Sequence, residues 1–328
     1  MSTTGFKLSD GRDLSLIFET YTTGTKADPT GFVVASGLDL NSVFAKNTSG
    51  TYTANDTGYK VQTGQDLRLL MEPLAPLTVT IGGITTIANS GSGNVYRYIF
   101  STSGNFTISI NKNITNFNVI VVGGGGAGST ARFTPTTLLG GGGAGGGIGL
   151  WSFQYTKNAS YNITVASAVT ASSSTGNTSS FVENKTGGVG IQSTGGAGGN
   201  LNSTERSISG VSSAISTISG TLITKNGGNG GAGAGSFPKY PTDSETLATP
   251  LSVLGYSFSY GGGGTYGSTG SYGTPGLNGR GGNAGTPNFL AACASSPGSG
   301  GGGGNAAGAG TNGGYGGRGE VVVIFQYP

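Results

Sequence analysis

Side chains that could perform acid–base, nucleophilic or metal chemistry are scarce in this sequence of 328 residues. It contains no histidine and one cysteine, Cys293, so neither a Ser-His-Asp triad nor a Cys-His pair can form. Asp243 and Glu245 could act as the paired carboxylates of a glycan hydrolase, but Pro241-Thr-Asp-Ser-Glu is more typical of a solvated loop. Cys293 stands among alanines and is expected to be a small packed residue. We therefore expect no catalytic residue, no metal site and no cofactor.

One glycine segment has the outline of a dinucleotide-binding turn. Val119-Ile-Val-Val, a predicted strand, is followed by Gly123-Gly-Gly-Gly-Ala-Gly128. A Rossmann fold would need a helix next and an acidic residue roughly 20 residues further on. Instead the chain continues with Ser-Thr-Ala-Arg-Phe-Thr-Pro-Thr-Thr into another glycine block, and no Lys-Ser/Thr pair follows any glycine run. Nucleotide binding is therefore not expected.

Glycine dominates the composition, with 68 residues. Its spacing is too irregular for collagen, and the 14 Phe and 14 Tyr argue against disorder. Fixing a glycine costs roughly 0.5–1 kcal/mol more backbone entropy than fixing an alanine. An ordered glycine-rich domain therefore needs interactions, repeated along the chain, that offset this cost. Extended threefold polyglycine II helices would supply them, because without side chains they pack closely and hydrogen-bond to several neighbours.

The first 72 residues repeat one pattern three times. The copies begin at Gly5, Gly31 and Gly58, which are 26 and 27 residues apart, and share Gly-Φ-x-Φ-x-x-Gly-x-Asp-Leu-x-x-Φ-Φ, where Φ is apolar or aromatic. Each copy is predicted to hold a short strand, a turn at the glycine and one helical turn capped by the aspartate. Such small units bury little surface alone, so we expect them to dock on other chains. The capping residues would be Asp13, Asp39 and Asp66, and the candidate docking residues are Phe6, Phe18, Phe32, Phe44, Tyr59 and Met71.

The order of strand patterns and glycine blocks predicts a mainly β fold with five parts. Residues 1–72 would form the docking repeats, and 73–95 a proline-containing connector with a β-hairpin. Residues 96–186 would form the base of a β-sandwich, and 187–319 a glycine-rich polyglycine II region with inserted loops. Residues 320–328 would be a closing β-strand of the base.

Strand pairings within the β body follow from turn residues and apolar content. Turns at Gly82-Gly83 and at Ser103-Gly104-Asn105 suggest hairpins, the second between Tyr96–Phe100 and Phe106–Ile110. Further strands are expected at Ile148–Tyr155 and Tyr161–Ala166. The β-branched segment Glu320–Tyr327 would pair with the buried strand Phe117–Val122, so the glycine segments would project from the base as long loops.

Aromatic residues gather in and beside the late glycine blocks. Tyrosine among Ser, Gly and Asn is the composition of surfaces that recognise ligands through rigid rings and adaptable polar contacts. The alternative interpretation is that the rings cap or space the glycine lattice. The candidate receptor-binding residues are Phe237, Tyr240, Tyr256, Phe258, Tyr260 and Phe289.

Charge and hydropathy exclude several partners. The net charge of +3 is spread without a Lys/Arg cluster, so nucleic acid is not an expected partner. No apolar stretch approaches the roughly 20 residues that span a bilayer, so we expect no membrane insertion. The first residues lack the apolar segment of a signal peptide, and a single cysteine fits assembly in a reducing compartment.

From Gly104 onward the sequence resembles the glycine-rich domain of virion surface proteins, notably phage tail-fibre proteins and giant-virus structural proteins. The resemblance rests, in order, on Gly104-Asn-Phe-Thr-Ile, Phe117-Asn-Val-Ile-Val-Val-Gly-Gly-Gly-Gly, Gly140–Gly147, Tyr161-Asn-Ile-Thr-Val, Asn177-Thr-Ser-Ser-Phe181 and Gly319-Glu-Val-Val-Val-Ile-Phe. The chain is also similar to the distal adhesins of T-even phages, which carry variable recognition segments on a polyglycine II core. That likeness implies recognition loops at 236–260 and 286–297. The N-terminal repeats resemble short modules of large DNA virus proteins.

These observations favour a non-enzymatic virion structural protein, a fibre, spike or capsid decoration present as a homo-oligomer or in many copies. The repeats would dock it to capsid or tail proteins after assembly in the host cytoplasm. The glycine body would project from the virion surface, where a host glycan or protein is a candidate partner. A cellular glycine-rich extracellular structural or ice-binding protein is the alternative, and a carboxylate-dependent glycan hydrolase is a third hypothesis.

Overall fold

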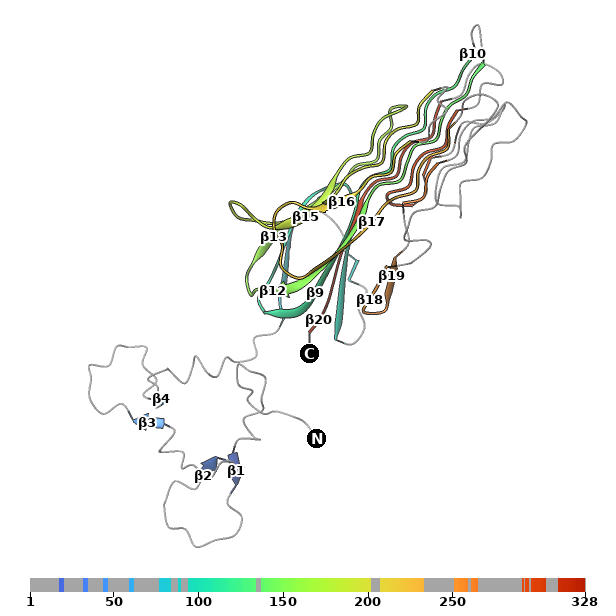
Figure 1. Cartoon of the computed structure of the whole chain (residues 1–328). Coiled ribbons are helices and arrows are strands. Elements are labelled where there is room, and N and C mark those ends of the chain that lie inside the picture. The colour runs from blue at the N-terminus through green and yellow to red at the C-terminus, as the bar shows by residue number, and fades with distance from the viewer. Residues whose placement is uncertain are drawn as a thin grey trace. The chain divides into compact units, whose positions relative to one another are not determined.

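The computed structural model shows a chain built from β-strands (Figure 1). It describes residues 18–20, 32–34, 44–46, 59–61, 77–83, 88–89, 94–133, 137–201, 207–232, 251–258, 261–264, 291, 293–294, 296–304 and 312–327. The chain divides into two compact units, Met1–Leu77 and Thr78–Pro328. Every element among the described residues is a strand, which confirms the predicted mainly β fold.

The described strands of the first unit form two short antiparallel hairpins. β1 (Phe18–Thr20) pairs with β2 (Phe32–Val34), and β3 (Phe44–Lys46) pairs with β4 (Tyr59–Val61). Each hairpin joins the last residues of one repeat to the first residues of the next. The residues before Phe18 and Phe44, where helical turns were predicted, lie outside the described residues, so this prediction is not tested.

Two six-stranded antiparallel sheets make up the base of the second unit. Sheet A has the order β17-β12-β9-β20-β7-β6, and sheet B has the order β16-β15-β14-β13-β8-β5. The strands of sheet A are β6 (Ala88–Asn89), β7 (Val95–Phe100), β9 (Ile114–Val122), β12 (Ile148–Tyr155), β17 (Thr221–Lys225) and β20 (Glu320–Gln326). Those of sheet B are β5 (Val79–Gly82), β8 (Gly104–Ile110), β13 (Ser160–Val165), β14 (Ser179–Glu183), β15 (Gly190–Ser193) and β16 (Ser212–Ala214).

The expected pairing of the closing strand is confirmed, and the hairpin expected between Tyr96–Phe100 and Phe106–Ile110 is wrong. β20 lies beside β9 with Val323 opposite Val119. However, β7 belongs to sheet A and β8 to sheet B, and β5 and β6 are likewise in different sheets. The turn between β7 and β8 is therefore a corner at which the chain changes sheet, whereas residues 84–87, expected as the second arm of the Gly82-Gly83 hairpin, lie outside the described residues. Turn residues mark a change of direction, but the strand partner depends on long-range packing.

Aromatic side chains fill the space between the two sheets. Trp151 and Phe181 are fully buried, and their rings lie 6.3 Å apart in an edge-on arrangement. The Trp151 indole N–H donates to the Ser219 carbonyl at 2.7 Å. The Tyr155 hydroxyl accepts from the Ile110 amide at 2.7 Å and donates to the Ala159 carbonyl. The polar ends of these large rings are thus satisfied, as burial of Tyr and Trp requires.

The second face of sheet A is also apolar, and a small hairpin packs on it. β18 (Leu251–Val253) and β19 (Tyr256–Phe258) are joined by a two-residue turn with φ of 45° at Leu254 and 78° at Gly255. Positive φ at both turn residues is the geometry of a type I′ hairpin. Leu251 completes a buried cluster on this face, against which Val253 and Tyr256 pack. The cluster consists of Ile120, Val122, Ile148, Leu150, Leu251, Val322 and Ile324.

Candidate functional site

Glycine segments extend from the sandwich as a bundle of neighbouring extended chains (Figure 1). The amide donors of the segment Gly123–Ser129 change partner with a period of three residues. One neighbour accepts from every third residue: it receives the amides of Gly123, Gly126 and Ser129 at Gly147, Ala144 and Gly141. A second neighbour receives those of Gly124 and Ala127 at Asn177 and Ser174. A third receives those of Gly125 and Gly128 at Gly317 and Gly314. Returning to the same neighbour every third residue is the signature of a threefold helix such as polyglycine II.

The segment Gly140–Gly147 follows the same rule with three other neighbours. Its donors at 140, 143 and 146 bond to Gly304, Gly301 and Gly298, those at 141, 144 and 147 to Asn200, Ala197 and Thr194, and those at 142 and 145 to Gly231 and Gly228. These neighbours run antiparallel. Other contacts are parallel, since Gly196 and Gly199 donate to Gly124 and Ala127. The hydrogen bonds therefore support the predicted lattice of threefold helices in both orientations.

Glycine is required in the bundle because neighbouring backbones approach too closely for a side chain. A Cβ atom at Gly125 would lie 1.8 Å from the Ser299 carbonyl oxygen, and one at Gly143 would lie 2.0 Å from that of Gly126. Real Cβ contacts are never this short. Alanine is also accommodated within the bundle, as at Ala144, which is fully buried. Close approach and hydrogen bonds in several directions make the bundle a stiff structural element.

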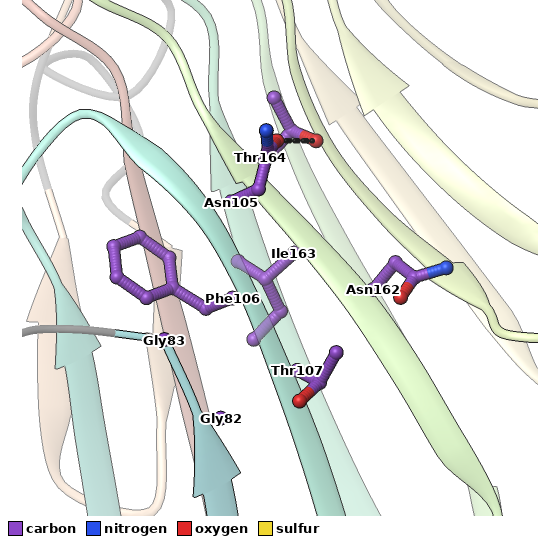
Figure 2. A pocket seen from close by; sticks show the side chains of 8 residues that line it. All are labelled: Gly82, Gly83, Asn105, Phe106, Thr107, Asn162, Ile163 and Thr164. Carbon is purple, nitrogen blue, oxygen red and sulfur yellow. Dashed lines mark hydrogen bonds between the residues drawn. The ribbon is translucent and has the colours of Figure 1, made fainter.

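Sheet B carries a shallow cleft of about 400 Å³ across three strands (Figure 2). Its polar side chains come from alternate positions of neighbouring strands, Asn105 and Thr107 on β8 and Asn162 and Thr164 on β13. Successive side chains of a strand point to opposite faces, so Ile163 turns into the core while these four stay at the surface. The cleft is completed by Gly82, Gly83, Phe106 and Ile163.

Glycines of β5 open this cleft, and hydrogen bonds fix its side chains. A Cβ at Gly82 would lie 2.4 Å from the Thr107 hydroxyl oxygen, so a larger residue would fill the space. The Thr164 hydroxyl donates to the Asn105 side-chain oxygen at 3.0 Å (Figure 2). The Asn162 amide donates to the Asn184 side-chain oxygen at 3.2 Å. The cleft therefore presents ordered hydroxyl and amide groups.

The lining of this cleft can hydrogen-bond but cannot act as an acid or base. None of its eight residues carries an ionisable side chain. A second cleft, at the start of β9 and the end of β12, is also uncharged and is lined by Thr115, Asn116, Ser152, Phe153, Gln154, Ser219, Gly220 and Thr221. The described residues contain no group of three or more potential metal ligands. Asp243 and Glu245 lie outside the described residues.

Glu320, at the start of β20, is the one described carboxylate with a strongly shifted pKa. The residue is 95% buried and lies opposite Val122, and its Oε1 atom has no hydrogen-bond partner. Burial raises the pKa of Glu320 to about 7, and the guanidinium of Arg318, 3.9 Å from Oε2, lowers it only in part. Because this carboxyl group is buried and its pKa is raised, its ionisation is expected to make stability depend on pH.

The structure describes only part of the predicted recognition set. Tyr256 begins β19, packs against the cluster on sheet A, and lies under the Arg97 guanidinium, 4.7 Å from the ring centroid. Phe258 ends the same strand, opposite Leu251. Phe237, Tyr240, Tyr260 and Phe289 lie outside the described residues. The structure thus brings Tyr256 and Phe258 together on one hairpin, and recognition by the aromatic set stays a prediction.

The predicted docking residues are placed in the same partial way. Phe18, Phe32, Phe44 and Tyr59 are the first residues of β1, β2, β3 and β4. Phe6, Met71 and the three predicted caps Asp13, Asp39 and Asp66 lie outside the described residues. Docking by the repeats stays a prediction.

Sequence reasoning was wrong about Cys293 and missed the cleft. Cys293 was expected to be packed, but it is exposed. The cleft residues carried a sequence pattern, since Asn105-Phe-Thr107 and Asn162-Ile-Thr164 each alternate polar and apolar side chains. Only the pairing of β8 with β13 shows that the two patterns form one surface.

A comparison with models of protein families agrees with the glycine-rich segments described above. A family model described as a glycine-rich domain matches residues 101–326, which include most of both sheets and all the described glycine segments. The chain belongs to the glycine-rich domain family. A search of curated proteins finds no match to it. In the described residues, no helix is long and apolar enough to cross a membrane.

Proposed function

We propose that this glycine-rich protein is a non-enzymatic structural component of a virion surface, as part of a fibre, a spike or a capsid decoration. Residues 1–72 would attach it to capsid or tail protein, and the glycine bundle would project outward. The observation that supports this role best is the bundle itself. Its threefold hydrogen bonding and sterically closed interior suit a mechanical element that must stay extended.

The geometry of the second unit favours projection. β9 and β12 run directly into the bundle segments that begin at Gly123 and end at Gly147, and β20 continues from the segment that ends at Gly319. Strands of the sandwich core thus continue as threefold helices without a flexible joint. A load on the bundle would pass into a core whose aromatic side chains are interlocked.

Deletion of residues 1–72 tests the attachment. The second unit is compact by itself, so the truncated protein should keep its thermal unfolding transition. It should be missing from purified particles, because the repeats that attach it are gone. A fusion of residues 1–72 to an unrelated fluorescent protein is the matched control and should be incorporated. Normal incorporation of the truncated protein would refute the attachment role.

A further inference from the structure

The outer face of sheet B carries an unbroken row of hydrogen-bonding side chains. Residues that lie directly opposite each other on neighbouring strands point to the same face of a sheet. The register of β8, β13, β14, β15 and β16 places five such side chains in line: Asn105, Thr164, Ser180, Gln192 and Ser213. Each of these residues is exposed or half-buried. The row therefore offers amide and hydroxyl groups across five adjacent strands.

The cleft shown in Figure 2 lies at one end of this row. It shares Asn105 and Thr164 with the row. Its other polar pair is Thr107 opposite Asn162, so amide and hydroxyl alternate both along the strands and across them. The bond from the Thr164 hydroxyl uses only the side-chain oxygen of Asn105, and the bond to Asn184 uses only the NH₂ group of Asn162. These bonds fix the two amides and leave the NH₂ group of Asn105 and the oxygen of Asn162 to contact a ligand.

A glycine and an apolar floor shape the cleft. The backbone of Gly82 is not in the left-handed region that would require glycine. A glycine inside a strand weakens it and often marks a place where a ligand approaches closely. A Cβ atom at Gly82 would lie 2.4 Å from the Thr107 hydroxyl oxygen, so a side chain here would cover that hydroxyl. Below the polar groups, Phe106 and Ile163 complete the lining. Polar groups above an apolar floor match a sugar ring, which has hydroxyls at its rim and C–H groups on its face.

We propose that the row binds a neutral oligosaccharide that lies across the strands of sheet B, with one sugar unit in the cleft. Neighbouring strands are about 4.8 Å apart, a spacing close to the length of one sugar unit in an extended glycan. Each unit would therefore meet one side chain of the row. Two adjacent hydroxyls of a sugar can bond to both groups of one amide, as offered by Asn105 and Gln192. The inference goes beyond the structural role proposed above and does not depend on attachment by the repeats.

The position of the row on the face of the sheet favours a saccharide over a peptide or a nucleic acid. Extended peptides bind sheets by pairing with the free backbone groups of an edge strand. β13, β14 and β15 each have a neighbouring strand on both sides, so their backbone groups already have partners. A nucleic acid needs lysine or arginine for its phosphates, and neither occurs in the row or in the lining of the cleft. The side chains of the row are thus the groups that a ligand would contact.

A glycan array probed with the full-length protein tests the class of ligand. The array carries neutral, sialylated and sulfated glycans, and we expect binding to neutral ones. Calorimetric titration should then show tighter binding of a neutral tetrasaccharide than of the disaccharide that forms half of it, because the longer chain reaches more of the row. Gln192→Ala removes an amide from the row and should weaken binding of the tetrasaccharide roughly fivefold or more. The matched control Gln154→Ala removes the same group from an exposed position of β12 in sheet A and should bind like the native protein.

A variant in the cleft completes the test. Thr164→Val keeps the shape of the side chain but removes the hydroxyl that positions Asn105, so it should also weaken binding. All three variants should keep the native thermal unfolding transition, and if Thr164→Val fails to fold, Asn105→Ala at its exposed position takes its place. Binding to no neutral glycan, a preference for sialylated or sulfated glycans, equal affinity for the two chain lengths, or undiminished binding by Gln192→Ala would each overturn the proposal. None of these outcomes depends on incorporation into particles, so the two proposals can fail separately.

Discussion

Substituting Gly125 by alanine probes the bundle at one of its closest backbone approaches. The new Cβ would lie 1.8 Å from the Ser299 carbonyl oxygen and 2.3 Å from its carbonyl carbon. Both atoms belong to the backbone, so no side chain can rotate away. The adjacent Gly124 provides a matched control in the same threefold helix. A Cβ there would meet its nearest atom, the Asn177 amide nitrogen, at 3.2 Å.

The expected cost follows from the displacement and the hydrogen bonds it disturbs. Overpacking of a well-packed interior costs about 1–3 kcal/mol. Moving the two helices apart also strains the bonds from Gly125 to Gly317 and from Gly317 to Ser299, each 2.8 Å long, and a backbone hydrogen bond contributes about 1 kcal/mol net. Gly125→Ala should therefore destabilise the second unit by about 3–5 kcal/mol. Gly124→Ala should change stability by less than about 1 kcal/mol, since alanine also lowers the entropy of the unfolded chain.

Differential scanning calorimetry of the full-length variants measures this difference. For a domain of this size each kcal/mol shifts the melting temperature by roughly 2–4 °C, so Gly125→Ala should melt roughly 10 °C lower than the native protein. Gly124→Ala should melt within a few degrees of the native value. Equal melting temperatures for the two variants would refute the argument, because stability would then not depend on the close approach at Gly125.

Two further predictions concern single side chains. Burial raises the pKa of Glu320 from 4.5 to about 7, so stability from this group is greatest below about pH 4.5 and is lost as the pH rises to about 7. Glu320→Gln should stabilise the protein at about pH 8 by up to about 3 kcal/mol and leave it unchanged at about pH 4, as measured by thermal melts at both pH values; an equal effect at both would contradict the assigned pKa. Tyr256→Ala should lower stability by about 1–3 kcal/mol, because it removes packing on sheet A and the contact with Arg97. The control Leu254→Ala, in the exposed turn of the same hairpin, should lower stability less. An unchanged melting temperature for Tyr256→Ala would show that the ring does not stabilise the fold.

The local pattern of residues was enough to predict the class of the fold and its central pairing. β-branched runs without polar alternation at Val119–Val122 and Val321–Phe325 indicated strands buried on both faces, and such strands pair most readily with each other. Glycine blocks that follow these strands indicated helices free of side chains. In both cases the residue type alone fixes the packing. Only glycine lets the bundle backbones approach so closely, and only apolar side chains suit both faces of a central strand.

Strand partners and surfaces were decided by the tertiary structure. The turn before Gly104 looks the same whether a chain reverses within one sheet or crosses to another, because a turn fixes direction and not partner. The hairpin of Tyr256 could not be distinguished from an exposed recognition loop, because the apolar face that it covers is assembled from four strands far apart in the sequence. The cleft of Asn105 and Asn162 has the same origin as that apolar face. Each depends on which strand lies beside which, and long-range packing sets that choice.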